Sequence, residues 1–172
     1  MGLDDIAIQF VDEGNSGPAV RFLVEWVSDG EAEARRYLAG HAEPDGTCLI
    51  ATSGCDAVGF AAIVWKSSYA GFRSRGIPLV HQVVVGEPWR RRGIATLLMD
   101  AAERLASDRG IASLGITVGL FDEYGPAQRM YGQRGYVPDG RGACQGQRPL
   151  SKGMQVSVDH DLIIWLTKDL IG

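Results

Sequence analysis

Three consecutive arginines, Arg90–Arg92, stand directly before Gly93, where an apolar pattern typical of a helix begins. The first turn of a helix presents backbone N–H groups without acceptors, and the positive end of the helix dipole lies there, so an anion is favoured. Gly93 would let a phosphate approach the backbone closely, and the arginine side chains would add charge-assisted hydrogen bonds. These residue types at this spacing predict a pyrophosphate site between Arg91 and Thr96.

Two familiar phosphate-binding motifs do not fit this segment. A P-loop requires Gly-Lys followed by Ser or Thr, whereas Gly93 is followed by Ile94 and Ala95. A dinucleotide-binding fingerprint requires three spaced glycines, and this turn supplies only one. The pattern that remains is Arg-x-x-Gly-x-Ala, which begins at Arg90 and directly follows the apolar segment 80–85.

The elements that must position these residues follow from the hydrophobic pattern. Apolar residues that alternate with polar ones indicate strands, and apolar residues at helical spacing indicate helices. Strands are expected over 6–10, 48–52, 58–65, 80–85, 114–118 and 162–166, with a further strand starting at Tyr136. Helices are expected to begin near Ser16, at a capping box from Ser28 to Glu31, at Gly93 and near Pro126, with loops over 67–76 and 141–155. This order predicts one α/β domain with a mixed sheet.

Composition narrows the class of protein. A chain of 172 residues with 45% apolar content suits one domain with a substantial core. Its net charge of −4 argues against nucleic acid as a general partner. No apolar run reaches the roughly 20 residues of a membrane-spanning helix. Because Asp4 and Asp5 stand where a secretory leader would carry basic residues, we expect a cytoplasmic protein with no membrane partner.

The three cysteines, Cys48, Cys55 and Cys144, are odd in number and match no metal-ligand spacing. We therefore expect reduced thiols and no bound metal. A disulfide between Cys48 and Cys55 across a hairpin is the alternative.

The segment from Arg90 to Ala95 resembles the pyrophosphate-binding segment of the GCN5-related N-acetyltransferase (GNAT) family, whose pattern is Gln/Arg-x-x-Gly-x-Gly/Ala. The family places this segment after its fourth strand, and the stretch from Val85 to Ala95 follows that form. A second family segment is matched at the expected distance by residues 124–136. The resemblance is specific over 80–136, and elsewhere only the order of elements agrees.

The resemblance implies a mixed, mostly antiparallel central sheet that is flanked by helices and splayed between its fourth and fifth strands. Residues 1–172 would form a single N-acetyltransferase domain. Acetyl-CoA, as the cosubstrate, would lie in the splay, with its pantetheine arm on the backbone of Val83 and Val85 and its pyrophosphate on the first turn of the next helix. The cofactor-binding residues implied in this way are Val83, Val84, Val85, Arg90, Arg91, Arg92, Gly93, Ile94, Ala95, Thr96, Tyr124 and Ala127.

Two residues are implied to act in catalysis. Tyr131 matches the family tyrosine that lies near the sulfur and donates a proton to the leaving thiolate, and a plain core position is the alternative. His81 is our candidate for the base, with a structural histidine as the alternative. It follows Leu79 by two residues, and Leu79 stands where protein-acetylating members often carry Glu. Tyr124 also departs from the family, because many members carry Asn there.

We therefore expect an enzyme that moves the acetyl group of acetyl-CoA to a primary amine, in the first place of a small molecule, by direct attack in a ternary complex. The alternatives are acetylation of a protein N-terminus or lysine, and a non-catalytic sensor of acyl-CoA; a homodimer is left open. Candidates for the acceptor site, with an ordinary loop and core as the alternative, are Trp26, Tyr37, Tyr69, Phe72, Arg73 and Arg75.

Overall fold

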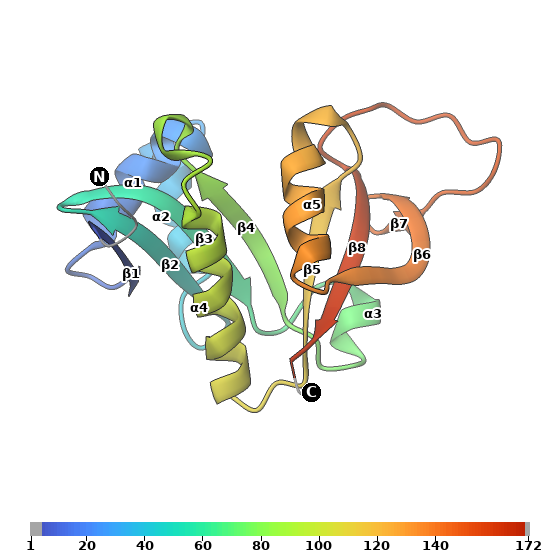
Figure 1. Cartoon of the computed structure of the whole chain (residues 1–172), viewed down its shortest axis with the longest axis horizontal. Coiled ribbons are helices and arrows are strands. Elements are labelled where there is room, and N and C mark those ends of the chain that lie inside the picture. Colours follow the sequence, from blue (N-terminus) through green and yellow to red (C-terminus); the bar gives the residue numbers. More distant parts are fainter. Residues whose placement is uncertain (1–4, 171–172) are drawn as a thin grey trace.

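An eight-stranded sheet in the order β1-β2-β3-β4-β5-β8-β6-β7 forms the centre of the protein, and the computed structural model describes residues 5–170 (Figure 1). Its strands are β1 (Ile6–Phe10), β2 (Gly46–Ser53), β3 (Asp56–Val64), β4 (Leu79–Val85), β5 (Ser113–Gly119), β6 (Val137–Gln145), β7 (Arg148–Pro149) and β8 (Leu162–Asp169). The helices are α1 (Ser16–Trp26), α2 (Glu31–Gly40), α3 (Ala70–Arg73), α4 (Ile94–Asp108) and α5 (Gly125–Gln133), with short 3₁₀ turns η2 (Glu87–Trp89) and η3 (Asp122–Tyr124).

The sheet is splayed between β4 and β5, which are its parallel pair. These two strands are paired only where they begin, through Leu79 with Gly115 and Val80 with Ile116. Beyond Val80 they diverge, as Figure 1 shows, whereas the other neighbouring strands are antiparallel. The fold class expected from the sequence is therefore confirmed, including the position of the splay.

Helices cover both faces of the sheet. On one face α4 and α5 pack over a core that includes Leu98, Met99 and Tyr131, and Gly59 of β3 lets α4 come close. A Cβ atom at Gly59 would lie 3.1 Å from Ile94 and 3.2 Å from Leu98. On the other face α1 and α2 pack over a second core that contains Phe22, Leu23 and Phe60.

The segment 67–76, which we expected to be a loop, contains the short helix α3 and part of a third core. Phe72 is 1% exposed, and its ring fills the space beside Gly115, where a Cβ atom would lie 2.1 Å from the ring. Tyr69 is also buried, with its ring centroid 4.2 Å from that of Trp165. These aromatic residues therefore anchor the segment beneath the point where β4 and β5 are still paired.

Two other expectations were wrong in detail. The second helix begins at Glu31 with Gly30 as its N-cap and without a side-chain cap, so Ser28 does not form a capping box; instead the Asp29 N–H donates to the Glu33 carboxylate. Residues 141–155 are not one irregular loop, because β6 extends to Gln145 and β7 follows. The pairing of β6 with β8 skips residues 139–142, where two glycines adopt positive φ, and this irregularity resembles a loop in the sequence.

Ion pairs join α4, α5 and β8 across the splayed side of the sheet. Arg134, which follows α5, lies 2.6 Å from Asp100 and 3.0 Å from Glu103, both on α4. Lys168 of β8 lies 2.7 Å from Glu103. The Arg134 and Glu103 side chains are each 14% exposed, so this contact is more shielded than a surface pair.

Each of the three cysteines is a free thiol, with Cys48 and Cys144 buried and Cys55 exposed, so the alternative disulfide is wrong. Burial raises the pKa of the Cys48 thiol to about 12. Within residues 5–170, no helix combines the length and the apolar character needed to cross a membrane.

Candidate active site

The edge of β4 that faces β5 is not paired with a strand beyond Val80. The Gly86 N–H donates to the Val58 carbonyl of β3 at 3.0 Å, whereas the Val85 carbonyl accepts from Nε of Arg90 at 3.1 Å. Because backbone groups of successive strand residues turn to opposite sides, Val83 and Val85 turn theirs towards the splay. The Val84 side chain packs instead with the core beneath α1.

The first turn of α4 has backbone donors to spare. Its N-cap is Gly93, with no side-chain cap and no acidic residue in the first turn. The first backbone bond of the helix runs from the Leu97 N–H to the Gly93 carbonyl, and in the described part of the chain no acceptor is bonded to the N–H groups of Ile94, Ala95 or Thr96. This end of α4 can therefore receive an anion.

The turn that leads into α4 holds its arginines in the open. Arg91 adopts φ 64° and Gly93 adopts φ 82°, both in the left-handed region. Arg92 stacks its guanidinium over the Trp89 ring at 5.2 Å from the centroid. Arg90, Arg91 and Arg92 are all exposed, and among residues 5–170 none of them forms an ion pair. Their charge is therefore available to a ligand at the start of α4.

Tyr131 combines a buried ring with a free hydroxyl. The residue is 5% exposed and packs in the core beneath α5, with its ring centroid 5.9 Å from that of Tyr136. Burial is the main cause that raises the pKa of its phenol, so the hydroxyl keeps its proton at neutral pH. No described residue makes a hydrogen bond with that hydroxyl, which leaves it able to donate to a ligand.

His81 occupies a bulge in β4. Ala62 of β3 pairs with Gln82 and Ile63 pairs with Val80, so His81 has no partner between them. The bulge turns its ring towards α2, where Nδ1 lies 2.8 Å from the Tyr37 hydroxyl.

A second histidine, His41, stands beside this pair. Its ring stacks on Tyr37 with centroids 4.1 Å apart and lies 5.2 Å from that of His81. Nδ1 of His41 is 2.8 Å from the Tyr37 carbonyl oxygen and must donate, because a carbonyl oxygen only accepts. Burial, and then the charge of His41, lower the pKa of His81, so its neutral form is favoured at neutral pH. His41 could not be recognised from the sequence. It is the residue that ends α2, and no local pattern shows that this position contacts a strand forty residues later.

The family model for acetyltransferases of the GNAT family matches residues 16–136, which is more than half of the chain. The chain belongs to this family. No curated protein matches the sequence at a significant level.

Solved structures of other GNAT proteins have the same fold. Aminoglycoside 6'-acetyltransferase type Ii is 17% identical, with a TM-score of 0.69 over 96% of this chain and 98% of that one. An acetyltransferase from Staphylococcus aureus Mu50 and one from Elizabethkingia anophelis with acetyl-CoA bound are each 14% identical. Both have a TM-score of 0.64 over 96% of this chain and 99% of theirs. At such low identity this likeness concerns the fold alone.

Tyr124, which stands where many GNAT members have Asn, is the last residue of η3, between β5 and α5. Its ring occupies the space over Gly119, where a Cβ atom would lie 2.3 Å from it. Its hydroxyl is 2.9 Å from Nδ1 of His160, in the segment before β8. Burial raises the pKa of Tyr124. The contact with His160 could not be predicted from the sequence, because this histidine is isolated in a polar segment. Ala127, the other cofactor-binding candidate of this region, lies about one turn further along, in α5, and is partly buried in the core.

The two catalytic candidates lie on opposite faces of this GNAT sheet. Tyr131 belongs to the core beneath α4 and α5, whereas His81 contacts Tyr37 of α2 on the other face. They are therefore not in contact with each other. Among the acceptor-site candidates, Tyr69 and Phe72 are core residues, whereas Arg73 and Arg75 are exposed. Residues 5–170 contain no group of three or more potential metal-ligating side chains.

Proposed function

We propose that this protein transfers the acetyl group of acetyl-CoA to a primary amine of a small molecule, by direct attack in a ternary complex. Membership of the GNAT family supports acetyl transfer. The observation that carries the proposal is the uncapped first turn of α4, with its unpaired N–H groups and three exposed arginines that form no ion pair in the described chain, beside the edge of β4 that β5 leaves uncovered. A diphosphate and an amide-bearing arm need these two sets of groups side by side.

The residues present fit acetyl-CoA in two ways. The N–H groups of Ile94, Ala95 and Thr96 would bind the pyrophosphate, and the arginines of the turn would supplement them. The outward backbone groups of Val83 and Val85 would extend the sheet by bonding the amides of the pantetheine arm, and Arg90 would then share or release the Val85 carbonyl to which it now donates. The cosubstrate supplies a thioester, whose carbonyl carbon is the electrophile.

Tyr131 acts in this scheme as the general acid. Its protonated hydroxyl donates to the sulfur while negative charge develops there, as the carbon–sulfur bond breaks and the amide bond forms. The buried ring fixes the direction of this donor, because it packs against Tyr136 and the core beneath α5. Tyr124, whose ring lies over the last residue of β5 and whose hydroxyl contacts His160, would contact the cosubstrate in place of the family Asn.

His81 acts as the base that removes the proton of the amine, directly or through a water molecule. To act as the base through Nε2, neutral His81 must carry its proton on Nδ1 and donate it to the Tyr37 hydroxyl, which leaves the lone pair on Nε2. The lowered pKa of His81 keeps this form available at neutral pH. The acceptor would therefore approach from the face of α1 and α2, opposite Tyr131.

Release of free thiol tests this proposal. The protein is incubated with acetyl-CoA and a panel of amines: polyamines, aminoglycosides, amino acids and aryl alkylamines. We expect one class to release thiol well above the rate without amine, and to yield the N-acetyl product by mass spectrometry. Binding of acetyl-CoA without release by any amine would contradict the proposal and would favour the sensor.

Protein acetylation remains the second candidate, and peptides distinguish it from the first. Leu79, which stands where protein-acetylating members often carry Glu, is 8% exposed and packs with Ile77 and Trp165 in the third core, so no carboxylate is available there. The same assay is run with peptides that carry a free N-terminus or an internal lysine. Faster thiol release with a peptide than with every small amine would replace our proposal by this candidate.

A further inference from the structure

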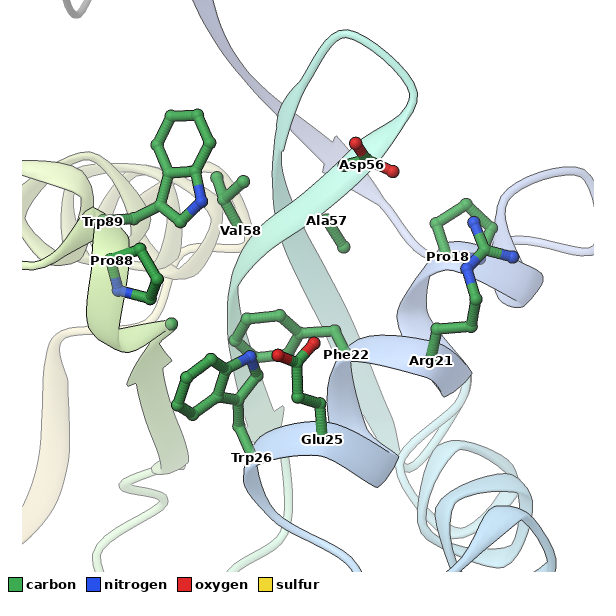
Figure 2. A pocket seen from close by; sticks show the side chains of 11 residues that line it. Pro18, Arg21, Phe22, Glu25, Trp26, Asp56, Ala57, Val58, Pro88 and Trp89 are labelled. Atoms are coloured by element: carbon green, nitrogen blue, oxygen red, sulfur yellow. The ribbon is translucent and has the colours of Figure 1, made fainter.

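A pocket of about 260 Å³ lies between α1, the start of β3 and the turn that follows β4 (Figure 2). Its lining residues are Pro18, Arg21, Phe22, Glu25, Trp26, Asp56, Ala57, Val58, Gly86, Pro88 and Trp89. Trp26 is one of the acceptor-site candidates and Trp89 stacks with Arg92, but none of the lining residues is assigned a catalytic or cofactor-binding role in the proposed acetyl transfer. The pocket contains Gly86, Pro88 and Trp89 from the turn after β4 but none of Val83 to Val85.

Aromatic side chains form the body of this pocket. Trp26 lies against Gly86, where a Cβ atom would be 3.3 Å from Nε1 of the indole, so glycine makes room for the ring. Phe22 is 2% exposed beside it, and Trp89 stands on the opposite side in Figure 2. Walls of this kind favour an apolar ligand group of the size of a phenyl ring.

Two opposite charges on α1 border the aromatic part. Arg21 and Glu25 are one helical turn apart, a spacing at which opposite charges often pair. In the described chain, however, neither of them forms an ion pair. Figure 2 shows the Glu25 carboxylate beside the Trp26 and Phe22 rings, whereas the Arg21 guanidinium points towards Pro18. The pocket thus offers an anion and a cation at separate points of its rim.

We propose that this pocket binds a free amino acid with an apolar side chain, as its zwitterion. Glu25 receives the α-ammonium group, Arg21 receives the α-carboxylate, and the side chain lies between Trp26 and Trp89. A simple amine would make no contact with Arg21, and a simple acid would make none with Glu25. The volume suits a ligand smaller than a typical drug molecule.

Tryptophan fluorescence reports on this site directly, because two of the four tryptophans of the chain line the pocket. The whole protein, without acetyl-CoA, is titrated with L-phenylalanine, with phenethylamine and with 3-phenylpropionate. These three probes share one ring and differ in which charge they carry. We expect saturable binding of L-phenylalanine that is at least tenfold tighter than that of either analogue, with the affinities confirmed by calorimetry.

Two substitutions assign the charges. Glu25→Gln should weaken L-phenylalanine binding at least tenfold and leave 3-phenylpropionate unchanged or improved, whereas Arg21→Gln should weaken L-phenylalanine and spare phenethylamine. Glu13→Gln, which removes an exposed carboxylate outside the pocket, is the matched control and should bind as the unmodified protein does. All three side chains are exposed, so circular dichroism should show folded variants.

The proposal is overturned if L-phenylalanine gives no saturable binding, if either analogue binds as tightly, or if Glu25→Gln and Arg21→Gln leave the affinity unchanged. Because no acetyl-CoA is present and no turnover is measured, failure here leaves the proposed acetyl transfer untouched. Conversely, if the protein binds L-phenylalanine but acetylates no amine, the amino acid site stands and the proposed acetyl transfer fails.

Discussion

At the scale of single residues, the hydroxyl of Tyr131 is the most specific chemical expectation. We predict that Tyr131→Phe lowers kcat about a hundredfold, the lower end of the usual contribution of a general acid, and leaves acetyl-CoA affinity nearly unchanged. Tyr136→Phe is the matched control, because its hydroxyl is buried without a hydrogen-bond partner and its ring packs beside Tyr131. Steady-state rates and calorimetry measure both. Equal effects of the two substitutions would mean that Tyr131 is only a core residue.

The second residue-scale prediction concerns the two stacked histidines. The charge of His41 contributes to the lowered pKa of His81, so His41→Gln should raise that pKa towards the ordinary value of about 6.5. A base is active when deprotonated, so the acidic limb of the pH–rate profile should move to higher pH. Proton NMR titration of the His81 ring measures the same shift without turnover. If the NMR pKa moves and the acidic limb does not, His81 is not the base.

At the scale of elements, Arg91 in the turn before α4 is expected to lower the folding stability and to raise the affinity for acetyl-CoA. Arg91 is a non-glycine residue at φ 64°, a conformation that costs an ordinary residue roughly 1–2 kcal/mol. Arg91→Gly should therefore raise the free energy of unfolding by about 0.5–1 kcal/mol, since glycine adopts this conformation readily. It should also weaken acetyl-CoA binding several-fold, because a free cation is lost.

Arg91→Lys separates these two effects. It keeps the charge and the strain, so both the affinity and the stability should stay close to those of the unmodified protein. Urea denaturation and calorimetry give the two quantities. A lower free energy of unfolding in Arg91→Gly than in the unmodified protein would contradict the argument that the Arg91 backbone is strained.

The contact between α4 and α5 gives a prediction on stability alone. Arg134→Met leaves Asp100 and Glu103 without their guanidinium, and Lys168 still neutralises Glu103. We expect a loss of about 2 kcal/mol, below the roughly 3–5 kcal/mol of a fully buried pair. Arg35→Met, which removes an exposed pair with Glu31 on α2, should cost less than about 0.5 kcal/mol. If urea denaturation gives similar losses of unfolding free energy for both variants, the Arg134 contacts contribute no more than an exposed ion pair.

Local patterns explain which elements could be predicted from the sequence. The strand and turn from Val80 to Gly93 and the helix after them were predictable, because apolar periodicity and the glycine act over a few residues. The irregular pairing of β6 with β8 was not, because it joins residues 17 to 30 positions apart and its glycines resemble a loop. His41 and His160 could not be predicted as neighbours of the candidate site for the same reason. His41 contacts His81, and His160 contacts Tyr124, only because the fold brings distant parts of the chain together.

At the scale of the whole molecule, the splay divides the sheet into two parts of the chain. Strands β1–β4 with α4 end by Asp108, and β5 begins at Ser113, so only residues 109–112 connect them along the backbone. Phe72 beneath Gly115 and the Arg134 ion pairs hold the two parts together. We therefore predict that co-expressed fragments 1–110 and 111–172 copurify. Phe72→Ala should reduce the yield of the pair, and failure of the unmodified fragments to associate would contradict the prediction.

The two parts of the sheet are also made one after the other during synthesis, because β1–β4 precede β5 in the chain. The ribosome completes β1–β4 and α4, and with them the uncapped helix start and the arginine turn, before it has made any residue of β5. Any folding intermediate in which β1–β4 are paired and β5 is not would present Val83 to Val85 as the exposed edge of a half-sheet, a surface that readily pairs with another strand. After β5 arrives, it pairs with β4 at two residues only, so the finished protein keeps most of that edge open. The place where a cosubstrate would bind is thus an edge that its own chain never covers.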